Sequence, residues 1–309
     1  MLSTSVLEAI GNTPVVQLRR VVPPGAAAVW IKLEYFNPTG SYKDRMALSI
    51  VEGAERSGRL RTGMRVVEYT GGSTGSSLAL VCAVKGYRFT AISSDAFSRE
   101  KLDTMRALGA DLTIIPSDGG KITPELFARF REAVARETAN PDVFWADQLN
   151  NPDVVEGYAA MGRELVAQLG SGINAFCGAV GSGGMLVGVA RALKAAGCGA
   201  RIVALEPAES PVLSGGQAGP HRVEGIGIGF RPKHLQPDEY HEVRAIPEDA
   251  ARVMARRLAR EEGIFAGTST GLNVTAAVEL AKELGPGAIV VTVAVDSGLK
   301  YLAGDLYSA

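Results

Sequence analysis

The sequence predicts an α/β protein of two domains, each an open and mostly parallel sheet flanked by helices. Two observations predict this fold class. From Val29 onward, short β-rich runs alternate with segments whose apolar residues recur at helical spacing, which is typical of parallel strands joined by crossover helices. A stretch rich in Asn, Asp and Pro, residues 138–151, then interrupts the alternation. It divides the pattern into two α/β portions of unequal length.

The expected elements follow one another along the chain. The runs that predict strands are 29–33, 65–69, 88–93, 111–115, 174–180, 201–205 and 288–293. The segments that predict helices are 44–57, 74–85, 99–108, 124–137, 154–169, 186–196, 247–262 and 272–284. Residues 214–235 contain Gly and Pro without clear periodicity, and so long an irregular segment in a compact domain is usually a functional loop.

The interruption in the pattern also suggests domain limits. We expect a smaller α/β domain over residues 41–148. The larger α/β domain would combine residues 1–40 with 149–309. A cleft between two such domains is the expected place for a ligand.

Composition excludes several classes of function. The chain has 309 residues, of which 46% are hydrophobic and 21% charged, as in an ordinary globular protein. Lys and Arg total 32 against 33 Asp and Glu, so the formal net charge is -1. No whole-chain charge therefore attracts nucleic acid or an anionic membrane. We expect the partner to be a small molecule or a second copy of the chain.

The cysteines and the first residues indicate the compartment. The three cysteines are far apart and never in CxxC spacing, so neither a disulfide framework nor a zinc site is suggested. The start of the chain lacks the order of a signal peptide, and no apolar run is long enough to cross a bilayer. The three histidines have no metal-ligand spacing, and we expect no metal. A cytoplasmic protein is the resulting expectation.

The most informative segment is Asn37–Arg45, which places Lys43 at the start of a predicted helix after a Pro-Thr-Gly turn. A lysine amine is a useful covalent catalyst when its pKa is lowered and its position is fixed, and burial beside a Gly-rich turn can supply both. Lys43 is therefore a candidate for covalent binding of an aldehyde cofactor. Taken alone, the segment is equally compatible with a surface lysine.

The segment Thr70–Gly75 follows a predicted strand and opens a predicted helix. Such a loop presents backbone N–H groups and hydroxyls to an anion at a helix N-terminus. Gly, Ser and Thr are also common in turns and caps, so a structural loop is the alternative. The segment is not a Walker A loop, because no Gly-Lys-Ser/Thr ends it.

Two further segments have the same character. Gly181–Met185 follows an apolar strand, and its three glycines let the backbone curl around a phosphate while Ser182 adds a hydroxyl. It lacks the partner acid of a dinucleotide site, which makes a nicotinamide cofactor the weaker interpretation. Gly267–Gly271 lies between two predicted helices, where a hydroxyl could bond a ring nitrogen or simply cap the helix that follows.

Together these four segments occur in the order and at about the separations found in the cysteine synthase and cystathionine β-synthase family. The chain resembles that family of fold-type II pyridoxal-phosphate enzymes over nearly its whole length. Further matches lie at Ile10–Pro14, Asp147–Pro152, Gly225–Phe230 and Glu262–Gly267. The resemblance implies a fold like that of the tryptophan synthase β chain, with the cofactor in the interdomain cleft and its phosphate loop on the larger domain.

The resemblance also implies roles for individual residues. Lys43 would hold pyridoxal 5'-phosphate and then act as base and acid at the substrate Cα. Ser269 would face the pyridine nitrogen, and a neutral hydroxyl there moderates the electron sink and favours β-elimination. The cofactor phosphate would be bound by Gly181, Ser182, Gly183, Gly184 and Met185.

The substrate carboxylate would be bound by two segments according to the same resemblance. These contribute Thr70, Gly71, Gly72, Ser73, Thr74 and Gln148, and the matching Gly225 lies on a further substrate loop. The commoner family loop has Ser-Gly-Asn where this chain has Gly71-Gly72-Ser73. The usual Asn lies beside the cofactor's 3-hydroxyl, which the shorter Ser73 could reach only through water or a shifted loop.

The implied activity is a β-replacement. An activated serine, either O-acetylserine or O-phosphoserine, would lose its leaving group to give an aminoacrylate, and a sulfur nucleophile would add to form cysteine or a related β-substituted alanine. A serine/threonine dehydratase, a cysteine desulfhydrase and a non-catalytic relative that binds a partner remain alternatives. Arg222 and Arg231 are candidates for binding a phosphate leaving group, although solvated loop arginines are the more economical interpretation. The resemblance also implies a homodimer.

Overall fold

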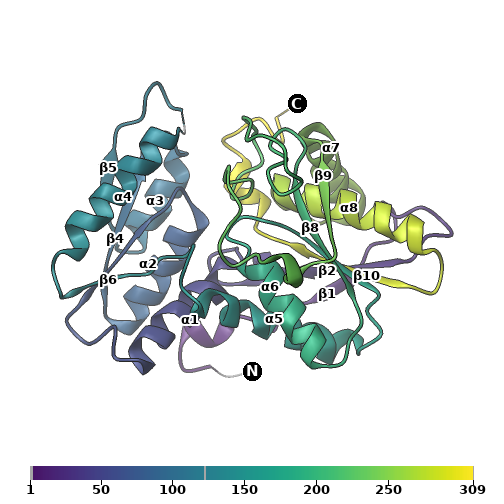
Figure 1. The fold of residues 1–309 in the computed structure, drawn as a ribbon, viewed down its shortest axis with the longest axis horizontal. Coiled ribbons are helices and arrows are strands. Elements are labelled where there is room, and N and C mark those ends of the chain that lie inside the picture. The colour runs from purple at the N-terminus through teal and green to yellow at the C-terminus, as the bar shows by residue number, and fades with distance from the viewer. Residues whose placement is uncertain (1–2, 122, 309) are drawn as a thin grey trace. The chain divides into compact units, whose positions relative to one another are not determined.

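The structure, a computed structural model, describes residues 3–121 and 123–308. Its backbone contacts divide the chain into two compact units. The first unit holds the residues up to Ile10 and the segment Lys43–Asp153, and the second holds Gly11–Tyr42 and the chain from Val154 onward. Each unit contains a sheet flanked by helices (Figure 1), so the α/β class predicted from the sequence is confirmed.

The first unit is built on a four-stranded parallel sheet in the order β5-β4-β3-β6. Its strands are β3 (Arg65–Tyr69), β4 (Arg88–Ser94), β5 (Asp111–Ile115) and β6 (Val143–Trp145). Its helices are α1 (Lys43–Arg56), α2 (Ser73–Lys85), α3 (Arg99–Ala107) and α4 (Pro124–Thr138), with a 3-10 turn η1 (Val6–Ala9). Phe130 of α4 and Val67 of β3 lie in its core and are almost fully buried. β3 and β4 are buried along nearly their whole length, whereas the edge strand β5 is mostly exposed.

The second unit is built on a six-stranded sheet in the order β1-β2-β10-β7-β8-β9, in which only the β1–β2 pair is antiparallel. Its strands are β1 (Val15–Gln17), β2 (Ala28–Leu33), β7 (Ala175–Ala179), β8 (Arg201–Pro207), β9 (Glu242–Ile246) and β10 (Ile289–Ala294). Its helices are α5 (Asp153–Leu169), α6 (Gly184–Ala195), α7 (Glu248–Arg257) and α8 (Thr268–Leu284). Helix α5 starts on Asp153, the last residue of the first unit. Short helical turns are η2 (Glu34–Phe36), η3 (Pro237–Glu239), a π-helical turn η4 (Leu258–Glu262) and η5 (Gly298–Tyr301).

A buried asparagine fixes helix α8 against the sheet of the second unit. The side-chain amide of Asn273 donates to the carbonyl of Val293 at 2.9 Å and accepts the N–H of Ala179 at 2.8 Å. Asn273 is fully buried, so each of these bonds satisfies a polar group that water cannot reach. The end of β7 and the first turns of α8 are thereby held in one arrangement.

All the predicted strands and helices are present, with differences at their limits. Helix α8 begins at Thr268 and not near Leu272, so Thr268–Gly271 is the first helical turn and the expected loop is wrong there. The helix expected over 247–262 is α7 followed by the π-helical turn. Three strands, β1, β6 and β9, were not expected. Between Pro207 and Pro237 the described residues form neither helix nor strand, as the irregular segment predicted.

Two absences among the described residues bear on function. No helix within 3–121 and 123–308 combines the length and apolarity that crossing a bilayer requires. Within the same residues, no cluster of His, Cys, Asp and Glu side chains could hold a metal ion.

Candidate active site

Lys43 is the first residue of α1, and its neighbours on both sides are fixed. The N–H of Tyr42 donates to the carbonyl of Val295 at 3.1 Å, just past the end of β10. On the other side, the carboxylate of Asp44 is fully buried and accepts the hydroxyl of Ser77 on α2 at 2.6 Å. Lys43 itself is 9% exposed. The lysine predicted from the sequence as a covalent catalyst is therefore buried and held at a defined place in the chain.

The loop between β3 and α2 is shaped by its threonine and its glycines. The hydroxyl of Thr70 accepts the N–H groups of Gly72 and Gly75, both at 3.2 Å. No side chain caps helix α2, whose N-cap is Gly72. The backbone N–H groups and the macrodipole of α2 therefore favour an anion at this loop, in agreement with a carboxylate-binding role.

The structure brings two of the predicted carboxylate-binding residues together. The hydroxyl of Thr74 donates to the amide oxygen of Gln148 at 2.7 Å. The amide nitrogen of Gln148 in turn lies 3.4 Å from the carbonyl of Tyr69, at the end of β3. Thr74 and Gln148 are 74 residues apart in sequence, and the contact forms because β6 pairs with β3.

Helix α3 covers the glycines of this loop, which the sequence did not lead us to expect. A Cβ atom on Gly71 would lie 2.2 Å from the ring of Phe97, and one on Gly75 would lie 2.1 Å from the sulfur of Met105. At Gly72 the nearest atom would be the Cδ of Lys101, at 3.0 Å. Lys101 and Met105 lie four residues apart on α3 and share one face, which the helical periodicity predicted over 99–108 indicated, whereas Phe97 precedes the helix.

The second candidate loop, Gly181–Met185, joins β7 to α6 within the second unit. Its Gly183 has a left-handed backbone, with φ of 83°, and is the N-cap of α6 without any side-chain capping bond. A Cβ on Gly181 would lie only 2.4 Å from the carbonyl oxygen of Gly225. The predicted phosphate loop and the predicted substrate loop at Gly225 are therefore in direct contact, and glycine is required for that approach.

Two buried serines lie at these segments. Ser182 is 7% exposed and Ser269 is 2% exposed. Their hydroxyls can donate a hydrogen bond to a ligand or accept one from it. Together with the uncapped N-terminus of α6, they fit a group that carries a phosphate and a ring nitrogen, as pyridoxal phosphate does.

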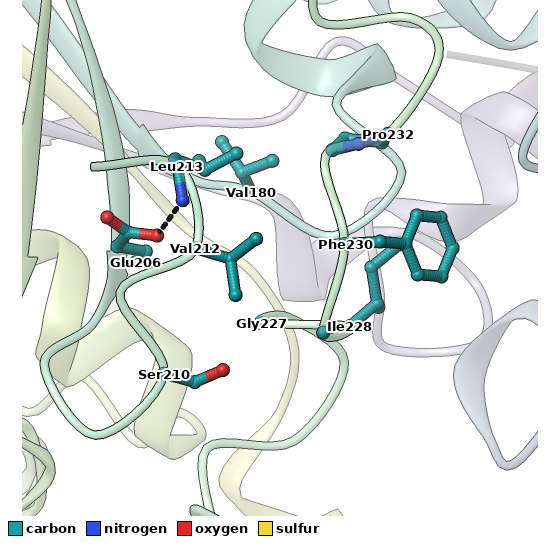
Figure 2. A pocket seen from close by; sticks show the side chains of 10 residues that line it. Val180, Glu206, Ser210, Val212, Leu213, Gly227, Ile228, Phe230 and Pro232 are labelled. Carbon is teal, nitrogen blue, oxygen red and sulfur yellow. Dashed lines mark hydrogen bonds between the residues drawn. The ribbon is translucent and has the colours of Figure 1, made fainter. Parts of the chain in front are cut away.

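The irregular segment after β8 is ordered around a buried carboxylate. Glu206 is 2% exposed and accepts the N–H groups of Leu213 at 2.6 Å and Ser214 at 2.9 Å. Figure 2 shows this bond to Leu213 beside a small pocket, with the ring of Phe230 directed away from Glu206. The pocket is lined by Val180, Glu206, Ser210, Val212, Leu213, Gly227, Ile228, Gly229, Phe230 and Pro232. The pocket therefore lies beside the segment that also carries Gly225.

Both candidate arginines are engaged within the second unit. Arg222 donates to Glu248 at 2.6 Å and to Asp305 at 2.9 Å. Arg231 donates to the Tyr240 hydroxyl at 2.6 Å and to the Leu213 carbonyl at 3.1 Å. Both arginines therefore have hydrogen-bond partners within the second unit.

Comparisons with known proteins agree with this site. The family model of pyridoxal-phosphate dependent enzymes matches residues 6–296. A cysteine synthase of Staphylococcus aureus is 43% identical over 98% of this chain and 97% of its own. Because the family model covers most of the chain, this protein belongs to the pyridoxal-phosphate dependent enzyme family, and the cysteine synthases are among its relatives. Pyridoxal phosphate is accordingly its cofactor.

Solved structures of this family have the same fold. O-acetylserine sulfhydrylase isoform 3 of Entamoeba histolytica superposes with a TM-score of 0.93 at 34% identity, covering 100% of this chain and 92% of that one. A hydrogen sulfide-producing enzyme of Fusobacterium nucleatum superposes with a TM-score of 0.90 at 33% identity, covering 98% of this chain and 99% of that one. The resemblance drawn from the motifs is therefore confirmed for family, fold and cofactor.

Proposed function

We propose that this enzyme carries out β-replacement on an activated serine, exchanging the leaving group on Cβ for a sulfur nucleophile to form cysteine or a related β-substituted alanine. Pyridoxal phosphate, when bound, supplies the electron sink that makes the Cα proton of the amino acid acidic. The observation that carries the proposal is the glycine-built, uncapped N-terminus of α6 with the buried Ser182 beside it. The relatives named cysteine synthase and O-acetylserine sulfhydrylase support the choice of reaction.

Lys43 is the proposed catalytic residue. Its amine would hold the aldehyde of the cofactor, and the same amine would serve as the base and acid for the proton at the substrate Cα. A base in this role needs a fixed position and partial desolvation. The buried start of α1 supplies these conditions, because Tyr42 and Asp44 are each held by a hydrogen bond.

The remaining site residues bind and orient. The backbone of Gly181, Ser182, Gly183, Gly184 and Met185 holds the cofactor phosphate in this proposal. Ser269 on the first turn of α8 offers a neutral hydroxyl to the pyridine nitrogen, and Ser73 would contribute to binding the cofactor. The substrate carboxylate is bound by Thr70, Gly71, Gly72, Ser73, Thr74 and Gln148 in this proposal, with Gly225 on a further substrate loop.

O-acetylserine is the activated serine that we propose. The two arginines that could recognise a phosphate leaving group already bond Glu248, Asp305, Tyr240 and Leu213. Using either for a second phosphate would cost these bonds, whereas an acetyl group needs no cation. Steady-state rates with O-acetylserine and O-phosphoserine compare the two donors directly, and a preference for O-phosphoserine would contradict this assignment.

The first experiment locates the cofactor. Reduction of the purified protein with borohydride, followed by peptide mass spectrometry, is expected to find the pyridoxyl group on Lys43. Lys43→Ala should abolish both this labelling and turnover, while Lys282→Ala, an exposed lysine on α8, should change neither. Labelling of another lysine would refute the role of Lys43, and a protein that stays colourless with added pyridoxal phosphate would refute the proposed function.

A second candidate reaction is net elimination. In this reaction water, and not a sulfur nucleophile, consumes the intermediate that remains once the leaving group has departed. The relative from Fusobacterium nucleatum that produces hydrogen sulfide supports this second candidate. The two reactions separate in one assay, because elimination from O-acetylserine gives pyruvate and ammonia without a sulfur nucleophile, whereas replacement gives cysteine only when sulfide is added.

We further propose that the enzyme works in the cytoplasm as a homodimer. Cys82, Cys177 and Cys198 are all free and buried, which suits a reducing compartment. Large apolar side chains of the second unit are exposed, among them Leu299 at 68% and Phe36 and Leu302 at 59%, as expected of surfaces that a second copy covers. Sedimentation equilibrium measures the mass, and a monomer at micromolar concentration would contradict the dimer.

A further inference from the structure

Glu68, the fourth residue of β3, is a buried carboxylate with three N–H groups directed at it. One oxygen accepts the N–H of Tyr69 at 2.9 Å and the indole N–H of Trp145 at 3.3 Å. The other oxygen accepts the backbone N–H of Gln148 at 2.9 Å. Glu68 is fully buried, so the carboxylate and its donors form a closed group inside the first unit.

The segment that Glu68 holds has an unusual backbone. Asp147 has φ of 49°, in the left-handed region that residues with a Cβ seldom adopt. Such a conformation persists only where surrounding bonds enforce it. Here the carbonyl of Asp147 accepts the N–H groups of Asn150 and Asn151, and its carboxylate accepts the side chain of Asn150 at 2.8 Å. The bond from Gln148 to Glu68 fixes the exit of this turn.

The turn determines where the side chain of Gln148 lies. Gln148 meets the hydroxyl of Thr74 at 2.7 Å, on the loop that we propose binds the substrate carboxylate. Without its backbone bond to Glu68, the left-handed turn would relax and the Gln148 amide would leave Thr74. We infer that Glu68 is a positioning residue for recognition of the amino-acid carboxylate, acting through the turn at Asp147 and the amide of Gln148. This inference rests on the proposed function for the identity of the bound carboxylate.

The protonation state of Glu68 should then control this recognition. Burial, reinforced by the nearby charge of Asp147, raises the pKa of Glu68 to about 7, although the N–H donors favour the ionised form. Tyr69 on β3, whose pKa burial raises to about 12, is a further titratable group beside it, and Arg131 on α4 acts on the pKa of Tyr69. A protonated carboxylic acid offers fewer acceptor sites than a carboxylate, so protonation weakens one of the three bonds.

The first test uses a reporter that the chain already contains. The sequence has two tryptophans, Trp30 and Trp145, so Trp30→Phe leaves the indole that bonds Glu68 as the single emitter. Emission of the full-length protein should titrate with a midpoint near pH 7. Glu68→Gln should abolish this transition, and Asp147→Asn should move it to lower pH because a negative neighbour is lost. Glu132→Gln, an exposed change on α4, should leave it unaltered.

The second test measures substrate recognition. The KM for O-acetylserine should rise as pH falls below 7, by at most about tenfold per pH unit, with kcat changing less. In Glu68→Gln the KM should lose this dependence. A fluorescence transition that survives Glu68→Gln would overturn the inference, and so would a KM profile that is the same in both proteins. Absence of turnover would refute the proposed function instead, and the fluorescence titration would then decide the role of Glu68 alone.

Discussion

Gly71 and Phe97 form a single contact that explains why the substrate loop departs from the commoner family pattern. The family more often has a serine at position 71, but the ring of Phe97 occupies the space that its Cβ would need, at 2.2 Å. The ring cannot simply turn away, because it stacks on Phe130 in the core of the first unit. The aromatic residue at position 97 therefore requires glycine at position 71.

We expect Gly71→Ser to reduce the free energy of unfolding by about 1–3 kcal/mol, the usual cost of overpacking a filled site. In the double variant with Phe97→Ala, the loss should be smaller than the sum of the single losses by about 1 kcal/mol, because the clash no longer exists. Urea unfolding of the four proteins measures this coupling. Additive losses would show that the two residues do not compete for the same space.

Residue-level prediction from sequence proposed roles for Lys43 and Gln148, whose motifs are local, and those roles stay predictions. It did not find Glu68 or Phe97, because their roles arise from contacts across strands and helices. Glu68 matters only once β6 pairs with β3 and brings the N–H of Gln148 to it. The only signal for Glu68 in the sequence was its place in the middle of an apolar run. A buried carboxylate at such a place requires hydrogen-bond donors around it.

At the scale of elements, the strands that the sequence missed are all at sheet edges. β1 and β9 close the six-stranded sheet and β6 closes one side of the other sheet. β1 and β9 are partly exposed and therefore lack the apolar run of a central strand, whereas β6 is a mostly buried apolar run of only three residues, too short to indicate a strand. The start of α8 was missed for a different reason. Its Gly and Thr residues resemble a loop, and tertiary contacts make them helical.

Gly271 in the first turn of α8 tests that explanation. Alanine at a helical position normally adds about 1 kcal/mol over glycine, but a Cβ here would lie 2.0 Å from the carbonyl oxygen of Ala251 on α7. The clash with backbone should exceed the gain, so we expect Gly271→Ala to lower the free energy of unfolding by about 1–3 kcal/mol. Gly199→Ala has open space around it and serves as the control in the same denaturation experiment. Equal stability of both variants would contradict the close α7–α8 packing.

At the scale of the whole molecule, the second unit is assembled from chain segments on both sides of the first. One of its strand pairs joins β2, near the start of the chain, to β10, near the end. Bringing such distant segments together costs conformational entropy. The first unit lowers this cost if it folds first, because its own ends are held together: Asp153 accepts the hydroxyl of Ser49 at 2.7 Å and the guanidinium of Arg59 at 2.7 Å.

This arrangement predicts an order of folding. Trp145 lies in the first unit and Trp30 in the second, so the variants Trp30→Phe and Trp145→Phe each report on one unit. During refolding from urea, the emission of Trp145 should recover before that of Trp30, since the β2–β10 pairing depends on long-range closure. Asp153→Ala should delay the Trp30 phase, whereas Asp142→Ala, an exposed change in the same unit, should not. Simultaneous recovery of the two emissions would mean that the units fold as one, and earlier recovery of Trp30 would mean that the β2–β10 pairing forms without a preformed first unit.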